Sequence, residues 1–247
     1  MSHDNALLRE LNLYPLWVRR DAEAVTSSVA VAPQQPTPPE SEMKRLTAPV
    51  STANQPSPYA NLGWEELKEK VKDCTDCKLR PTCTQTVFGV GDEQADWMIV
   101  GEGPGADEDI KGEPFVGQAG KLLDNMLAAI KLKRSNNVYI GNIVKCRPPA
   151  NRTPEADEVT QCLPYLRRQI ELIQPKLIVA LGKTAATSLL GRDAALGSLR
   201  GQLHEFNGVP LIITYHPAYL LRSPTEKAKA WQDLCLAVAT MEKLIQP

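Results

Sequence analysis

A carboxylate in a glycine-rich turn is the first group in this sequence whose position suggests chemistry. The segment Gly101–Gly105 follows an apolar run at Trp97–Val100, which predicts a turn carrying Glu102 at the end of a buried strand. Glycines let backbone N–H groups approach a ligand closely, and open α/β sheets place their sites at the carboxyl ends of strands. Phe115 follows, outside any periodic core pattern. An aromatic ring can stack on a flat ligand such as a nucleobase. A carboxylate in a turn beside it suits a reaction with water.

Further polar residues end the strands that the sequence predicts. The predicted strands are Trp97–Val100, Val138–Val144, Leu177–Leu181 and Pro210–Thr214. Asn142 lies late in the second strand, Gly182 follows the third and His216 follows the fourth. Segments with helical spacing separate the strands, which predicts a parallel sheet covered on both faces, so these ends would converge on one pocket. Taken singly, Asn142 would be a turn residue and His216 an unreactive loop residue. Their coincidence favours a site.

The helices expected between and after these strands follow from apolar periodicity. We expect one around Leu122–Ile130, a short one from Thr153 that stops before Pro164, one around Leu166–Ile173, and a closing helix over Glu226–Ile245.

Two nucleotide-binding motifs fail on spacing. Leu181–Thr184 ends in Gly-Lys-Thr, but Leu177 stands where a P-loop requires its first glycine. Gly101–Gly105 lacks the spacing of the dinucleotide fingerprint. ATPase and NAD-dependent functions are therefore rejected.

The cysteines predict a site with four thiolate ligands. Cys74 and Cys77 form a CxxC pair, whereas Cys146 and Cys162 are fifteen residues apart, and Cys83 competes for a ligand position. Zinc sites usually show a second close pair, whereas iron–sulfur clusters tolerate irregular spacing, so the residues leave zinc and a cluster open. Cys235, among apolar residues of the last predicted helix, is expected in the core.

Composition divides the chain into segments. The 247 residues are 43% hydrophobic and 23% charged, as in ordinary globular proteins. Residues 26–61 are rich in Pro, Ala, Ser and Thr and predict a disordered linker before a folded domain at 62–247. No apolar run is long enough for a membrane span and no signal peptide is recognised, so a cytoplasmic, nucleoid-associated location is expected.

Charge is distributed unevenly along the predicted folded domain. Residues 61–130 hold 7 basic and 14 acidic residues, whereas residues 131–247 hold 16 basic and 9 acidic residues. The basic half is consistent with a phosphate-binding face and equally with a solvated surface.

Taken together, these residues resemble the family 4 uracil-DNA glycosylases across residues 62–247. The motifs that carry the resemblance are Gly101–Gly105, Pro114–Gly117, Gly141–Arg147 and Tyr215–Arg222, in the family's order. The resemblance implies the three-layer αβα sandwich of the uracil-glycosylase superfamily, here with a four-stranded parallel sheet. It also implies a [4Fe-4S] cluster in place of zinc, with Cys83 excluded. The implied cluster ligands are Cys74, Cys77, Cys146 and Cys162.

The resemblance further implies a monofunctional glycosylase that excises uracil from single- or double-stranded DNA. Glu102, with the backbone of Gly101 and Gly103, would hold the attacking water, and His216 would stabilise the departing base. The residues implied to bind uracil are Phe115 by stacking, Asn142 by reading its edge and Glu108 by excluding the methyl group of thymine. The implied DNA contacts are Lys145, Arg147, Arg152, Leu221 and Arg222.

Two other interpretations of the domain are weighed. A sister group binds the abasic sugar covalently through a histidine after the second strand, but residues 146–154 contain none, so ordinary turnover is expected. A non-catalytic nucleic-acid-binding or redox-sensing iron–sulfur protein would need the cysteines but not the pocket residues.

The N-terminal residues predict a separate contact. Residues 6–20 are amphipathic, precede the linker and weakly resemble the N-terminal peptide of the psi subunit of the bacterial clamp loader. Residues 1–25 are therefore predicted to be a docking peptide for the replication machinery, or alternatively a helix that folds onto the domain. We expect a monomer.

Overall fold

The computed structural model describes residues 58–245. The predicted docking peptide at 1–25 and the predicted linker up to residue 57 lie outside the described residues. Within the described part, the elements in chain order are α2 (Trp64–Lys72), η2 (Arg80–Thr82), β1 (Val90–Gly91), β2 (Trp97–Gly101), α3 (Ala106–Lys111), α4 (Gln118–Ala129), β3 (Val138–Asn142), η3 (Pro149–Asn151), α5 (Ala156–Ile173), β4 (Leu177–Leu181), α6 (Lys183–Leu190), α7 (Leu196–Leu199), β5 (Leu203–Phe206), β6 (Val209–Thr214), α8 (Pro217–Arg222), η4 (Pro224–Glu226) and α9 (Lys227–Ile245).

The sheet has the strand order β1-β3-β2-β4-β6-β5. Its central strands β3, β2, β4 and β6 are parallel and are the four strands that the apolar runs predict. The two edge strands are antiparallel to their neighbours and were not predicted. Asn207 and Gly208 join β5 to β6 with φ of 49° and 84°. An Asn-Gly pair with positive φ at both residues is a common hairpin turn, so this sequence signal could have found β5.

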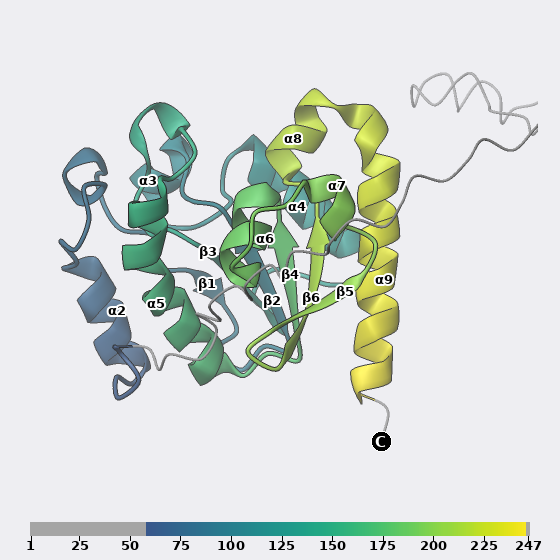
Figure 1. The fold of residues 1–247 in the computed structure, drawn as a ribbon, viewed down its shortest axis with the longest axis horizontal. Helices are drawn as coiled ribbons and strands as arrows, with labels where there is room; N and C mark the ends of the chain where they lie inside the picture. The colour runs from purple at the N-terminus through teal and green to yellow at the C-terminus, as the bar shows by residue number, and fades with distance from the viewer. Residues whose placement is uncertain (1–57, 246–247) are drawn as a thin grey trace, which may run out of the picture. The chain divides into compact units, whose positions relative to one another are not determined.

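Helices cover both faces of the sheet, which confirms the predicted α/β class and gives three layers (Figure 1). Side chains alternate along the strands: Met98 and Val100 join the core under α2, α5 and α6, whereas Trp97 and Ile99 join the core under α4 and α9. This alternation follows from the two-residue period of a strand with both faces buried.

One helix boundary predicted from the sequence is wrong. α5 runs without a break from Ala156 to Ile173 and contains Pro164, where a helix end was expected. Proline inside a helix costs about 3 kcal/mol. Cys162 and Leu163 before it and Tyr165 and Leu166 after it are all buried. Burial of such side chains contributes about 1.5–3 kcal/mol each, so packing outweighs the local cost of the proline.

None of the helices described between residues 58 and 245 is long and apolar enough to cross a membrane.

Candidate active site and cysteine cavity

The carboxyl ends of the parallel strands surround a cavity of about 480 Å³, which we call the base cavity. Glu102 follows β2, Asn142 ends β3 and His216 follows β6, and all three line it. Glu108 from α3 and Phe115 from the loop before α4 complete the set that the sequence singled out. Residues more than 100 positions apart are therefore brought together by the shared edge of the sheet.

Asn142 lies in the wall of the base cavity with an unsatisfied polar atom. Its side chain is 2% exposed, and its Oδ1 has no hydrogen-bond partner. The strand beneath it must carry glycine, because a Cβ at Gly101 would lie 2.4 Å from Asn142 Oδ1 and 2.5 Å from Phe115 Cζ. A buried polar atom without a partner costs about 1–3 kcal/mol, so its retention points to a ligand that pairs with it.

Phe115 is held in an uncommon backbone conformation. Its φ is 56°, in the left-handed region, and the side chain is buried. Arg134 donates to the carbonyl oxygens of Pro114 at 2.8 Å and Phe115 at 2.7 Å, and it also binds Asp124. A non-glycine residue with positive φ persists only where its surroundings fix it, and Arg134 supplies two of the bonds that do so. No motif or spacing in the sequence indicates this role for Arg134.

His216 faces Phe115 across the cavity, with ring centroids 5.6 Å apart. Its Nδ1 accepts the backbone N–H of Ala218 at 3.2 Å, so the neutral ring carries its proton on Nε2. Burial lowers the pKa of His216 to about 4, and the positive charge of Arg222 adds to this while Glu108 opposes it. His216 is therefore a neutral donor at physiological pH.

Glu102 is fixed by a residue that the sequence analysis did not assign to the site. The hydroxyl of Thr184 donates to Glu102 Oε2 at 2.5 Å. Thr184 stands in the Gly-Lys-Thr segment that fails as a P-loop.

Glu108 has both carboxylate oxygens engaged by the backbone. Oε2 accepts the N–H of Gly105 at 3.1 Å, and Oε1 accepts those of Val116 and Gly117 at 2.9 and 3.0 Å. Glu108 thus ties the start of α3 to the loop that carries Phe115. Gly103 is packed closely as well, since a Cβ there would lie 2.7 Å from Val144 Cγ2.

The basic residues predicted to contact DNA fall into different environments. Lys145 is 1% exposed, and its Nζ donates to Asn142 O at 3.0 Å and Gln169 Oε1 at 2.7 Å. The prediction that Lys145 contacts phosphate is corrected, because its ammonium group is enclosed and paired. The sequence pattern could not show this, since lysine is almost never fully buried unless it is paired.

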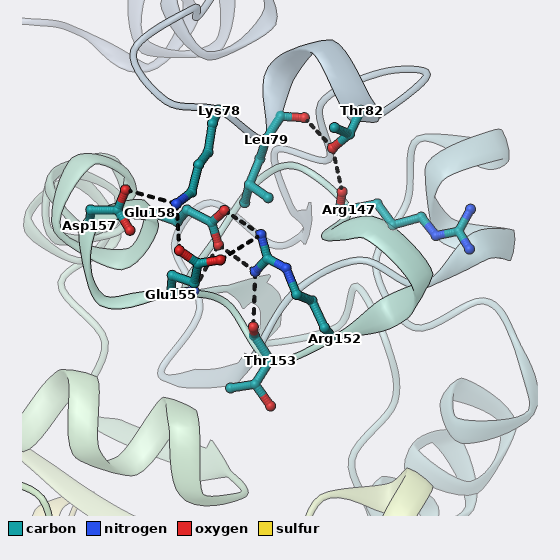
Figure 2. A network of polar contacts seen from close by, with 9 residues as sticks. All are labelled: Lys78, Leu79, Thr82, Arg147, Arg152, Thr153, Glu155, Asp157 and Glu158. Carbon is teal, nitrogen blue, oxygen red and sulfur yellow. Dashed lines mark hydrogen bonds and ion pairs between the residues drawn. The ribbon is translucent and has the colours of Figure 1, made fainter.

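Arg147 and Arg152 lie on either side of the short helix η3, and Figure 2 shows both beside a network of polar contacts. Arg152 lines the base cavity. Arg147 donates from Nε to Asn151 at 2.8 Å, while its terminal nitrogens point away from the network (Figure 2). Arg152 makes a bidentate pair with Glu158 at 2.8 and 2.6 Å, and this pair lowers the pKa of the buried Glu158. Lys78, from the CxxC segment, pairs with Glu155 and with Asp157, the latter at 3.3 Å.

Helix α8 brings two further predicted DNA contacts to the same edge of the sheet. Leu221 is 45% exposed and Arg222 is exposed, whereas Leu220 between them and the core is buried. Tyr219 and Arg222 line the base cavity. Helix α8 therefore places an exposed apolar side chain and a positive charge next to each other beside the base cavity.

The four predicted ligand cysteines line a second cavity, which we call the cysteine cavity. Cys74, Cys77, Cys146 and Cys162 all contribute to its wall, and Cys83 does not. The backbone N–H of Lys145 donates to Cys162 Sγ at 3.2 Å. Burial raises the pKa of the Cys146 thiol, and the neighbouring Cys83 adds to this. Among residues 58–245, no three or more His, Cys, Asp or Glu side chains are arranged to hold a single metal ion.

A polar hub supports the CxxC loop. Asp76 accepts hydrogen bonds from the hydroxyls of Tyr59 at 3.1 Å and Tyr165 at 2.9 Å, and the two rings stack with centroids 4.3 Å apart.

The prediction that Cys235 lies in the core is wrong, because its side chain is exposed on α9.

Comparisons with known proteins show the family of the chain. Residues 88–235 match the family model described as the uracil DNA glycosylase superfamily. The chain is 45% identical over 168 residues to a type-4 uracil-DNA glycosylase of Archaeoglobus fulgidus, covering 65% of this chain and 84% of that protein. It is 43% identical over 180 residues to the Pyrobaculum aerophilum type-4 enzyme, covering 70% and 91%. It is also 43% identical over 167 residues to the Thermotoga maritima enzyme, covering 67% and 86%.

The chain belongs to the uracil-DNA glycosylase superfamily and, within it, to the type-4 enzymes, which confirms the resemblance predicted from the motifs.

Proposed function

We propose that the base cavity receives the uracil of a flipped nucleotide and that Glu102, Phe115, Asn142 and His216 act on it. As a uracil-DNA glycosylase, the chain is a hydrolase that removes uracil from DNA by cleaving its N-glycosidic bond. Excision leaves an abasic site for base-excision repair. A base inside a duplex cannot reach such a cavity, so the nucleotide must leave the stack at a cost of a few kcal/mol.

The unpartnered Oδ1 of Asn142 is the observation that carries the proposal. In the base cavity it would accept the N3–H of uracil while the side-chain amide donates to O4. Cytosine offers an acceptor at N3 and a donor at C4, so both bonds would be lost. Phe115 lies against the same glycine as Asn142 and would stack on the base that Asn142 reads.

His216 would stabilise the negative charge that develops on uracil as the bond breaks. Its Nε2–H is the free donor, because Nδ1 already accepts the N–H of Ala218. A neutral donor placed in advance at a developing oxyanion is worth about 2.7–4 kcal/mol, a factor of about 10² to 10³ in rate. The pKa of about 4 keeps the ring neutral throughout the physiological range.

Glu102 would hold the attacking water on the sugar side. Thr184 occupies Oε2, which leaves Oε1 to accept from water, and the backbone at Gly101 and Gly103 passes close beside it. Glu108 would help to exclude the methyl group of thymine, since it fixes the loop that carries Phe115.

DNA would lie across the rim of the base cavity. Leu221 would enter the space that the flipped nucleotide leaves, and Arg222 and Arg147 would contact phosphate. Arg152 shares that rim, with its guanidinium already paired to Glu158. No histidine lies in residues 146–154, which supports ordinary turnover without a covalent DNA intermediate.

The donor set of the cysteine cavity fits a [4Fe-4S] cluster. Four thiols in the wall of one cavity suit a cube that takes one thiolate at each iron, whereas zinc requires four ligands around one ion. When bound, the cluster would hold together segments that are far apart in the sequence. Cys74 and Cys77 would be joined to Cys146 after β3 and Cys162 on α5.

A glycosylase assay tests the proposal directly. The protein is incubated with an end-labelled oligonucleotide holding one uracil, then treated with alkali, which cleaves the strand at an abasic site. Asn142→Ala is expected to slow excision at least about 100-fold, because two hydrogen bonds that read the base are lost. Equal excision by Asn142→Ala would refute the assigned role. Absence of excision by the cluster-loaded wild type would favour a binding or sensing protein.

The remaining predictions concern partners and the segments outside the fold. Residues 6–20 would dock to the clamp loader, with the part of the predicted linker before the packed Tyr59 as the tether and the glycosylase acting as a monomer on nucleoid DNA in the cytoplasm. Deleting residues 1–25 should abolish binding to a purified clamp-loader complex. Unchanged binding would remove the docking role.

A further inference from the structure

The turn between β4 and α6 contacts both residues that we assign to the chemical step. Gly182 has a φ of 89°, and its N–H donates to Thr214 O at 2.8 Å. A Cβ at Gly182 would lie 3.0 Å from the Cβ of His216. Two residues later, the hydroxyl of Thr184 donates to Glu102 Oε2. One turn therefore packs against His216 and bonds to Glu102.

We propose that Thr184 is a positioning residue that sets the orientation of the Glu102 carboxylate. A glutamate side chain rotates about three bonds, and fixing such a chain costs up to about 2 kcal/mol of rotamer freedom. A charge-assisted hydrogen bond offsets that cost, and the β-branched side chain of threonine has few rotamers to lose. With Oε2 held by Thr184, the carboxylate presents Oε1 to the water in every turnover.

The contacts of Gly182 and Thr184 account for the segment Leu181–Thr184, which fails as a P-loop. In Leu181–Thr184, the lysine that a P-loop would direct at phosphate is exposed and pairs with Asp193 at 2.9 Å. Gly182 instead packs against His216, and Thr184 bonds to Glu102, so both contact residues that line the base cavity. The inference rests on the proposed role of Glu102 as the residue that holds water.

The test compares variants of one hydroxyl group under single-turnover conditions. Thr184→Val keeps the shape of the side chain but removes the donor, and it is expected to slow excision about 10- to 100-fold, as small misplacements of catalytic groups do. Thr184→Ser restores the hydroxyl and should restore most of the rate. Thr160→Val is the matched control, because Thr160 also lies in a helix, its hydroxyl bonds to the carbonyl of Ala156 at 2.7 Å, and it does not line the base cavity.

Two further readouts separate positioning from folding. Binding to DNA that carries 2′-fluoro-deoxyuridine, which resists hydrolysis, should be unchanged in Thr184→Val, and so should the melting temperature. A slow Thr184→Val protein that also binds this DNA weakly or melts early, or that serine does not rescue, would overturn the proposal.

Glu102→Gln distinguishes failure of this inference from failure of the proposed function. If Glu102→Gln excises uracil at the wild-type rate, the role of Glu102 itself is wrong. If Glu102→Gln is slow and Thr184→Val is not, only the positioning role is overturned. If Thr184 acts through Glu102, the double variant should be no slower than Glu102→Gln alone.

Discussion

The base cavity and the cysteine cavity are both lined by residues from the segment 142–148, but they differ in one respect: among the described residues, the wall of the base cavity holds a buried side-chain atom without a partner and the wall of the cysteine cavity holds none. Asn142 lines the first cavity, and Lys145 and Cys146 line the second. In the base cavity, Asn142 Oδ1 has no partner, and within the described residues the imidazole ring of His216 is hydrogen-bonded through Nδ1 and not through Nε2. Around the cysteine cavity, Lys145 Nζ has two partners and the hydroxyl of Tyr165 bonds to Asp76.

This difference is expected if the base cavity binds a ligand only during the reaction and the cysteine cavity stabilises the fold permanently. Unpaired buried groups are tolerated where a substrate satisfies them during the reaction. Paired groups around the thiols hold the cysteines in place. Variants at the base cavity should therefore change rate, and variants at the cysteine cavity should change stability.

The largest effect is expected from loss of a cysteine that we propose as a cluster ligand. Cys146→Ser should lower the iron content and reduce the free energy of unfolding by about 4 kcal/mol or more, because loss of a structural metal site is among the most destabilising changes. Iron per chain, visible absorption and the melting temperature measure this. Cys83→Ser is the matched control, since Cys83 does not line the cysteine cavity. Iron loss with Cys83→Ser and retention with Cys146→Ser would reverse the ligand assignment.

The next effect separates rate from stability. His216→Ala should slow single-turnover excision about 10²- to 10³-fold, because it removes the donor aimed at the departing base. The melting temperature should change little. His204→Ala is a suitable control, since His204 bonds to Leu199 O at 2.7 Å and does not line the base cavity. A normal rate in His216→Ala would show that the base leaves without this donor.

The pH dependence of stability reports the same histidine. Burial lowers the pKa of His216 to about 4 in the folded protein, whereas the unfolded chain has about 6.5. Between these values the unfolded state binds more protons, so the stability that neutral His216 supports is complete above about pH 6.5 and falls as the pH drops toward 4. His216→Gln should flatten the unfolding free energy across this range. An unchanged slope would mean that the ring is not desolvated.

The sequence predicted the sheet better than it predicted the environment of its charges. The runs at Trp97–Val100 and Leu177–Leu181 became β2 and β4, because buried parallel strands have a strong apolar signature. The edge strand β1 has two residues and carries no such signature. Lys145 was misassigned because its partner Gln169 lies 24 residues away, on a helix whose course through Pro164 was itself not predicted.

The residues that line the base cavity could be predicted from the ends of the strands, but the residues that fix their orientation could not. Asn142 and His216 are placed by the parallel sheet, whose ends meet at one edge. Thr184 and Arg134 act through single contacts to Glu102 and to the Phe115 backbone. Such contacts depend on tertiary packing, and periodicity or local spacing does not encode them.

A smaller rate effect is expected where the base cavity depends on a backbone brace. Arg134→Ala removes two bonds to the carbonyls of Pro114 and Phe115 and should slow excision about tenfold, since about 1.4 kcal/mol corresponds to a factor of ten. The loss should appear mainly in uracil affinity, measured by inhibition with free uracil. Arg134→Lys keeps the charge but not the forked geometry and should recover little. Full recovery by lysine would mean that charge matters more than the two aimed bonds.

The smallest effect is expected at the cysteine cavity. Tyr165→Phe removes the hydroxyl that donates to Asp76 at 2.9 Å, while the bond from Tyr59 to the same oxygen remains. One neutral donor to a carboxylate contributes about 1–2 kcal/mol, so the melting temperature should fall by about 2–8 °C. The excision rate at 25 °C should stay unchanged, because Tyr165 lines the cysteine cavity and not the base cavity. A slower rate at an unchanged melting temperature would mean that the cysteine cavity takes part in turnover and does not only support the fold.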